Sequence, residues 1–167
     1  IDQEDQLLAK GSTLNLTATI EPANATNKNV TWASNDEAVA TVSADGVVTT
    51  AVEGTAIITV TTENGNKTDT IEITVASVVN TTQGKGYLTI NAALEEADAE
   101  DTILVGTGTY PENIIIDKSI SLIGMGIGNT IIAGTVPKGI SPMAIITVGG
   151  DFYHGITSRQ IDPDLSL

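Results

Sequence analysis

The sequence contains no cysteine and few basic residues: 7 Lys and Arg stand against 21 Asp and Glu, for a formal net charge of −14. A chain without cysteine has neither a disulfide framework nor a thiolate zinc site. Binding to nucleic acid or to an anionic membrane surface depends on clustered Lys and Arg, so both partners are disfavoured. No apolar run approaches the roughly 18–20 residues of a membrane-spanning helix, so we expect no membrane insertion.

Residues with β-branched side chains dominate what is present. Thr, Ile and Val make up about a third of the 167 residues, and such side chains fit pleated strands better than helices. The composition therefore predicts a mostly-β protein. Glycine marks a change of character along the chain, because residues 1–78 contain four glycines and residues 79–167 contain twelve. We predict two units with these bounds.

The first unit is predicted to consist of short strands separated by turns. Residues 13–20 alternate between polar and apolar, which is the period of a half-buried strand. Asp45-Gly46 and Asn64-Gly65 are typical hairpin turns. Further strands are expected at 30–34, 38–43, 47–50, 55–62 and 68–75. This pattern indicates an antiparallel sandwich, and Trp32 is interpreted as its core anchor rather than as a ligand platform.

The motifs of this unit follow a set order: Gly11-Ser12-Thr13-Leu14, Ile20-Glu21-Pro22-Ala23, Val30-Thr31-Trp32-Ala33-Ser34, Asp45-Gly46-Val47-Val48 and Gly54-Thr55-Ala56-Ile57. From about Leu7 to Val75 they resemble a bacterial immunoglobulin-like domain of the second group, the Big family. The resemblance implies an extracytoplasmic spacer or binding module of a bacterial surface or secreted protein, and it implies no catalytic residues.

The second unit opens with a helix candidate, Leu88–Ala99. Its apolar face carries Ile90, Leu94 and Ala97, and acidic residues lie opposite. Short apolar strands are then expected at 102–105, 113–116, 120–123, 130–133 and 144–148. Their regular spacing, with Gly-rich turns between them, fits either a sandwich or a solenoid whose coils take about 20–30 residues.

The motifs of the second unit favour the solenoid: Leu88-Thr89-Ile90-Asn91-Ala92, Asp101-Thr102-Ile103-Leu104-Val105, Gly108-Thr109-Tyr110-Pro111-Glu112 and Asp117-Lys118-Ser119-Ile120. Over residues 86–157 they resemble the N-terminal coils of a right-handed parallel β-helix of the pectin-lyase-like superfamily, nearest to pectinesterases. The resemblance implies that the short helix plugs the N-terminal end. The expected fold class is all-β: an immunoglobulin-like sandwich followed by a truncated right-handed parallel β-helix with a short N-terminal capping α-helix.

No catalytic, cofactor-binding or metal-binding residue is assigned. The resemblance implies that the carboxylate pair of pectinesterase-like enzymes lies further along the solenoid than this chain reaches, and Arg159 matches no pattern of that family. Where the family carries a Thr-rich turn, this chain has Lys138-Gly139-Ile140-Ser141-Pro142. A net-negative unit also repels polyanionic pectin. We therefore expect this chain to bind or display, and not to catalyse.

Acidic residues gather around the end of the predicted helix: Glu95, Glu96, Asp98, Glu100 and Asp101. Ca²⁺ takes six to eight oxygen ligands and is the one cofactor to consider there, but the spacing fits no EF-hand loop, so a solvated charged face is favoured.

Other candidates have simpler interpretations. Asp36, Glu37 and Asp45 lie in expected turns, where Asp favours the local backbone. His154 has no placed catalytic partner. The glycines at 124, 126 and 128 are interpreted as turn residues, because no helix follows to hold a phosphate.

The functional expectation is an extracellular bacterial modular protein, either secreted or at the cell surface. In it, an immunoglobulin-like spacer carries the start of a β-helix directed at polysaccharide or a cell-surface glycan. The alternatives are a fragment of a carbohydrate-active enzyme, a pectinesterase or polysaccharide lyase, and a structural adhesin stalk. Since the chain starts at Ile1 and residues 102–157 supply about two coils, we expect either a piece of a longer protein or a chain that self-associates through its open β-helix end.

Overall fold

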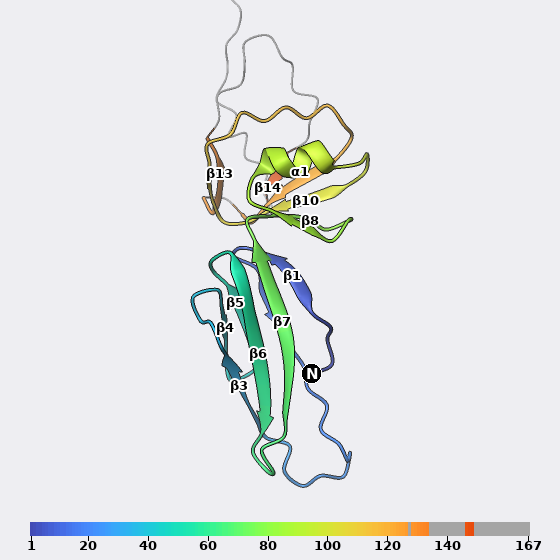
Figure 1. Ribbon diagram of the computed structural model, residues 1–167, viewed down its shortest axis with the longest axis vertical. Coiled ribbons are helices and arrows are strands. Elements are labelled where there is room, and N and C mark those ends of the chain that lie inside the picture. The colour runs from blue at the N-terminus through green and yellow to red at the C-terminus, as the bar shows by residue number, and fades with distance from the viewer. Residues whose placement is uncertain (127, 134–145, 149–167) are drawn as a thin grey trace, which may run out of the picture.

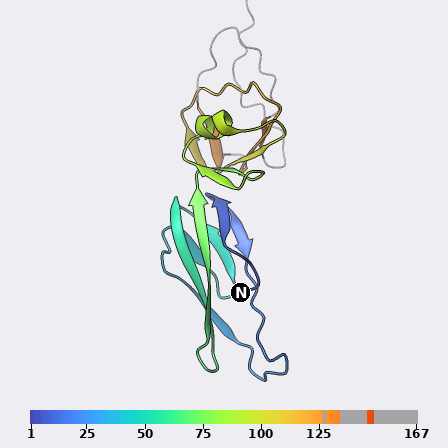
Figure 2. The same cartoon turned by 45° about the vertical axis from the view of Figure 1, so that its right-hand side comes forward.

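The computed structural model describes residues 1–126, 128–133 and 146–148. Within them, a two-sheet sandwich and a second β-rich unit lie end to end (Figures 1 and 2). Strand β7 (Thr68–Ala76) is the last strand of the sandwich, and β8 (Val78–Asn80) is the first strand of the second unit. Ser77 is the only residue between these two strands. No helix in the described residues is long and apolar enough to cross a membrane.

The first sheet of the sandwich has the order β1-β7-β6-β3, with β1 Gln6–Ala9, β3 Val30–Ser34 and β6 Gly54–Thr62. The second sheet has the order β2-β5-β4, with β2 Thr13–Asn15, β4 Ala40–Val42 and β5 Val47–Thr50. Apolar residues of both sheets meet in the core: Leu16, Val39, Ala40, Val48, Ala56, Ile58, Ile71, Ile73 and Val75. The prediction of a β-sandwich is thus confirmed.

In the sandwich, one predicted strand is shorter than expected and one strand was not predicted. Residues 13–20 keep the predicted alternation of burial, but the ladder ends at Asn15, and the Leu16 amide donates instead to the Gly46 carbonyl. Strand β1 was not expected, and it pairs in parallel with β7 from Gln6↔Ile73 onward. A parallel pairing between segments so distant in sequence leaves no local pattern from which to predict it.

The two expected hairpin turns join antiparallel strands, but both loops exceed two residues. The Gly46 amide donates to the Ser43 carbonyl and the Ser43 amide to the Val47 carbonyl, which leaves a three-residue loop with Gly46 at φ +79°. Such loops combine a type I turn with a left-handed residue, for which glycine is suited. In the β6–β7 loop the left-handed residues are Gly65 and Asn66.

The second unit contains one helix, α1 (Ile90–Glu96), and two sheets among the described residues. The larger sheet has the order β14-β12-β10-β8-β9, in which β10, β12 and β14 are parallel and β8 runs antiparallel to β10. The smaller sheet pairs β11 with β13 in parallel. The bounds are β9 Lys85–Tyr87, β10 Thr102–Val105, β11 Gly108–Tyr110, β12 Ser121–Gly124, β13 Thr130–Ile132 and β14 Ile146–Val148.

Helix α1 is shorter than predicted but buries the predicted face. Ile90, Leu94 and Ala97 are buried and pack with Ile103 of β10 and Tyr110 of β11. Thr89 has an extended backbone and is the N-cap of the helix. Its hydroxyl accepts a hydrogen bond from the Ala92 amide. The helix therefore fills the space beside both sheets, as the two views show (Figures 1 and 2).

The strand expected at 113–116 is wrong. No ladder forms there; the preceding strand is β11, and Ile114 and Ile116 pack against the core from an irregular segment. Alternating burial without a neighbouring strand to pair with produces an extended segment and not a strand.

Candidate functional site

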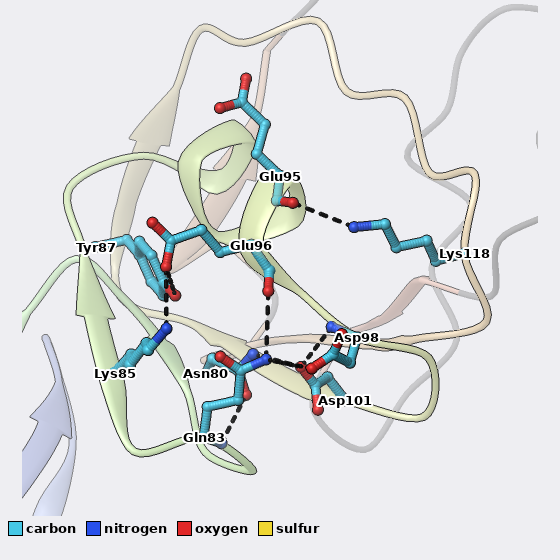
Figure 3. Close-up of polar contacts among 9 residues, drawn as sticks. All are labelled: Asn80, Gln83, Lys85, Tyr87, Glu95, Glu96, Asp98, Asp101 and Lys118. Carbon is cyan, nitrogen blue, oxygen red and sulfur yellow. Dashed lines mark hydrogen bonds and ion pairs between the residues drawn. The ribbon is translucent and has the colours of Figure 1, made fainter.

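The acidic residues around the end of α1 do not converge on one point (Figure 3). Asp101 is buried, at 3% exposure, and its Oδ2 accepts from Nδ2 of Asn80 (2.8 Å), Nε2 of Gln83 (2.7 Å) and the backbone amide of Asp98 (2.8 Å). The hydrogen bond from Asn80 is the main reason that the pKa of the Asp101 carboxyl lies below its usual value. The prediction of a solvated residue is wrong for Asp101, which organises the turn between α1 and β10.

Glu96 has different partners, on β9. Its Oε2 accepts from Nζ of Lys85 (3.2 Å) and from the hydroxyl of Tyr87 (3.1 Å). These contacts, with Lys85 first, lower the pKa of the Glu96 carboxyl, and the same contact raises the pKa of Lys85. Burial is the main cause of the raised pKa of Tyr87. Glu96 therefore ties the helix to the edge strand of the larger sheet.

Glu95 and Glu100 complete the acidic set and are exposed, as is Asp98. In Figure 3 the Glu95 carboxylate points away from those of Glu96, Asp98 and Asp101. Among the described residues, no three Asp, Glu or His side chains gather so that they could hold a metal ion. Nothing in this arrangement supports the Ca²⁺ alternative, because Ca²⁺ needs six to eight oxygens around one point.

The turn residues singled out in the sequence have structural roles. Asp36 Oδ1 accepts from the amides of Ala38 (3.1 Å) and Val39 (3.4 Å), as expected of Asp in a turn. Trp32 is half-buried and packs against the sandwich core beside Gly46, which agrees with its interpretation as a packing residue. Gly126 and Gly128 have left-handed backbones in the turn that leads to β13. His154 and Arg159 lie outside the described residues.

The polar cluster that the sequence did not reveal lies where the two units meet. Lys10 Nζ donates to Oε1 of Glu53 at 2.9 Å, and the hydroxyl of Ser77 donates to the same oxygen. The Ser77 carbonyl accepts from the Gly106 amide (2.8 Å) and the Tyr110 hydroxyl (3.0 Å). These residues come from segments far apart in the chain, so no motif connects them.

Beside this cluster lies a shallow groove of about 560 Å³. Its wall consists mainly of backbone and of apolar or hydroxyl side chains, with Glu53 as the single carboxylate: Leu7, Glu53, Gly54, Thr55, Thr74, Val75, Ala76, Gly86, Tyr87 and Leu88. Its two titratable side chains are Glu53 and Tyr87, and Glu53 accepts hydrogen bonds from Lys10 and Ser77. The cluster is therefore suited to holding the units together.

The contacts of Glu53 predict that the stability of the protein depends on pH. The hydrogen bond from Ser77, then that from Lys10, lowers the pKa of Glu53 from 4.5 to about 2. A carboxyl whose pKa is lowered by folding stabilises the protein above pH 4.5, and this contribution is lost as the pH falls towards about 2. Because the side chain is 33% exposed, solvent screening reduces the contribution to about 1–2 kcal/mol.

We expect Glu53→Gln to lower the free energy of unfolding by that amount at pH 6 and by almost nothing at pH 2. Chemical denaturation at pH 6, 4 and 2 measures the difference from the unchanged protein. Glu37→Gln, which alters an exposed turn carboxylate, is the control. A Glu53→Gln effect that stays constant over this pH range contradicts the prediction.

Comparison with known proteins identifies the sandwich. The family model of the bacterial Ig-like domain (group 2) matches residues 1–75. An alpha-L-arabinofuranosidase of Bifidobacterium longum subsp. longum is 44% identical over 114 residues, which are 68% of this chain and 11% of that protein. An Ig-like virion protein of Serratia phage KSP90 is 46% identical over 77 residues, 46% of this chain and 30% of that protein. A kappa-carrageenase of Pseudoalteromonas carrageenovora is 46% identical over 70 residues, 42% of this chain and 18% of that protein.

The chain spans less than a third of each of these relatives. The family match ends at Val75, one residue before β7 ends, so the matched residues and the sandwich coincide. The order of motifs, the two-sheet core and the family model agree over this segment. Residues 1–75 of the chain are a bacterial Ig-like domain of group 2.

Proposed function

We propose that the chain is a non-catalytic part of an extracellular, modular bacterial protein directed at carbohydrate. In this protein the Ig-like domain is a spacer that presents the second unit. The proposal depends mainly on one observation: a single residue, Ser77, separates the last strand of the domain from the first strand of the second unit. In both views the two lie end to end, which suits a spacer (Figures 1 and 2).

The names of the relatives support the carbohydrate part of the proposal. Two of the three described above carry names of enzymes that act on glycans, an arabinofuranosidase and a carrageenase. The 114 residues matched to the arabinofuranosidase exceed the 75 of the family model by 39, so that match reaches into the second unit. A carbohydrate-active enzyme as the parent protein is therefore the favoured form of the proposal, ahead of an adhesin stalk.

The pairing of the second unit supports its interpretation as the start of a parallel β-helix. Thr102 pairs with Ser121, and Gly108 pairs with Thr130, so both parallel sheets repeat after about 20 residues. A solenoid with two sheets per coil has this repeat. Helix α1 covers the core beside the first of these strands, as expected of an end cap.

The use of the polar side chains in the described residues supports the non-catalytic part of the proposal. Asp101, Glu96 and Glu53 are each engaged in contacts that hold backbone segments together. A carboxylate committed to such contacts has a lowered pKa and is a poor general acid or base near neutral pH. In the described part of the chain, these carboxylates therefore contribute to position rather than to chemistry.

Affinity electrophoresis tests the proposal. The chain is run through native gels that contain a neutral polysaccharide, arabinan or xylan, or an acidic one, pectate or carrageenan. An acidic protein that does not bind glycans is the mobility reference. We expect retardation by a neutral polysaccharide and little by the acidic ones, because a net charge of −14 repels polyanions. Retardation by none of them contradicts the carbohydrate part, and release of reducing sugar contradicts the non-catalytic part.

A further inference from the structure

The outward side of the larger sheet in the second unit carries a row of apolar residues. Val79 pairs with Leu104, and Leu104 pairs with Ile123. Directly paired residues share one face of a sheet. The row begins beside the Ig-like domain. An apolar outward face on a sheet has to be covered.

The end of the Ig-like domain provides that cover. Ala9 and Ala76 are buried and form one apolar cluster with Val79, and Leu7 and Leu104 pack against it. Val79 is only 3% exposed although it faces outward from its own unit. At Gly86 the approach is so close that a Cβ would lie 2.8 Å from the Cβ of Ala76. The two units thus share a small core of their own.

Backbone contacts join the units around this cluster. The Gly106 amide donates to the Ser77 carbonyl and the Thr107 amide to the Lys10 carbonyl, each at 2.8 Å. A Cβ at Gly106 would meet backbone atoms of Lys10 and Ser77 at 2.8–2.9 Å, so the backbones lie in direct contact. Main-chain hydrogen bonds of this kind define one relative orientation, which a flexible linker does not.

From these contacts we propose that the Ig-like domain is the outer cap of the second unit. It covers the apolar start of the outward row, and the second unit depends on this cover for its stability, so that the two behave as one body. The inference extends the spacer role proposed above. Its test follows hydrogen exchange and not glycan binding, so a failure to bind polysaccharide leaves it standing.

The first test alters the domain side of the junction. Gly11 and Gly65 have the same φ of +86°, so alanine introduces the same backbone strain at either position. At Gly11 the new Cβ overlaps the side chain of Thr107, whereas nothing lies within 4 Å at Gly65. We expect amides of β10 and β12 to exchange about tenfold faster in Gly11→Ala than in Gly65→Ala. Equal exchange in the two variants overturns the proposal.

The second test alters the other side and stands if Gly11→Ala does not fold. Leu104 packs against the shared cluster, and Ile123, its neighbour in the same row, is not part of that cluster. Leu104→Ala is expected to speed exchange in β1, in the Ig-like domain, about tenfold relative to Ile123→Ala. Exchange in β1 that is the same in both variants shows that the units are independent, and it overturns the proposal.

Discussion

Replacement of Asn80 by leucine is expected to lower the free energy of unfolding by about 2–4 kcal/mol, among the largest effects of a single substitution in this chain. Asn80 is completely buried, and its Nδ2 donates to Asp101. Its Oδ1 accepts from the amides of Thr82 and Gln83, each at 3.1 Å. Leucine is similar in size but leaves two backbone donors and a buried carboxylate without this partner. Chemical denaturation at pH 7 measures the loss.

The control is Asn24→Leu, which alters an exposed loop asparagine and is expected to change the free energy of unfolding by less than about 0.5 kcal/mol.

Asn80→Asp tests the same site through the direction in which stability changes with pH. A second carboxylate beside Asp101 raises the pKa of the pair above that of the unfolded chain. The penalty is therefore largest at neutral pH and shrinks as the pH falls. Loss of stability that is equal at pH 7 and pH 4 contradicts this account of Asn80.

Reversal of charge at either end of α1 is expected to lower the free energy of unfolding by about 2–3 kcal/mol. The Glu112 carboxylate accepts from the amides of Ile90 (3.0 Å) and Asn91 (2.9 Å), at the positive end of the helix. Lys118 donates to the carbonyls of Leu94, Glu95 and Ala97 at the negative end. Glu112→Lys and Lys118→Glu each remove these bonds and place the wrong charge beside the backbone. Chemical denaturation measures each loss.

The double variant Glu112→Lys with Lys118→Glu distinguishes this arrangement from an ion pair. If the two side chains stabilised each other, exchanging them would restore the interaction. Since each binds one end of the helix, the exchange leaves both ends with the wrong charge, and the losses are expected to add. Recovery of the double variant to within about 0.5 kcal/mol of the unchanged protein contradicts the prediction.

These contacts show why the helix was predictable and its anchoring was not. The spacing of Ile90, Leu94 and Ala97 indicates one buried face whatever lies against it, and that face is buried. Glu112 and Lys118 lie more than twenty residues from the helix ends that they bind. Nothing in their local sequence distinguishes them from solvated charges.

The acidic residues around 95–101 illustrate the same limit. Charge density in the sequence favoured a solvated face, which is right for Glu95 and Glu100 and wrong for Asp101. Asp101 is buried because Asn80, from the strand that follows the Ig-like domain, brings a donor to it. A buried carboxylate is stable only with such partners, and the partner lies 21 residues away.

By itself, the sequence determined the Ig-like sandwich, the positions of most strands and the buried face of α1, because these depend on alternation, turn chemistry and helical periodicity within a few residues. The tertiary structure alone decided the parallel pairing of β1, the burial of Asp101 and the junction at Lys10, Glu53 and Ser77. Each of these depends on groups brought together from distant segments. Their contacts stabilise the protein only once the surrounding core has excluded water.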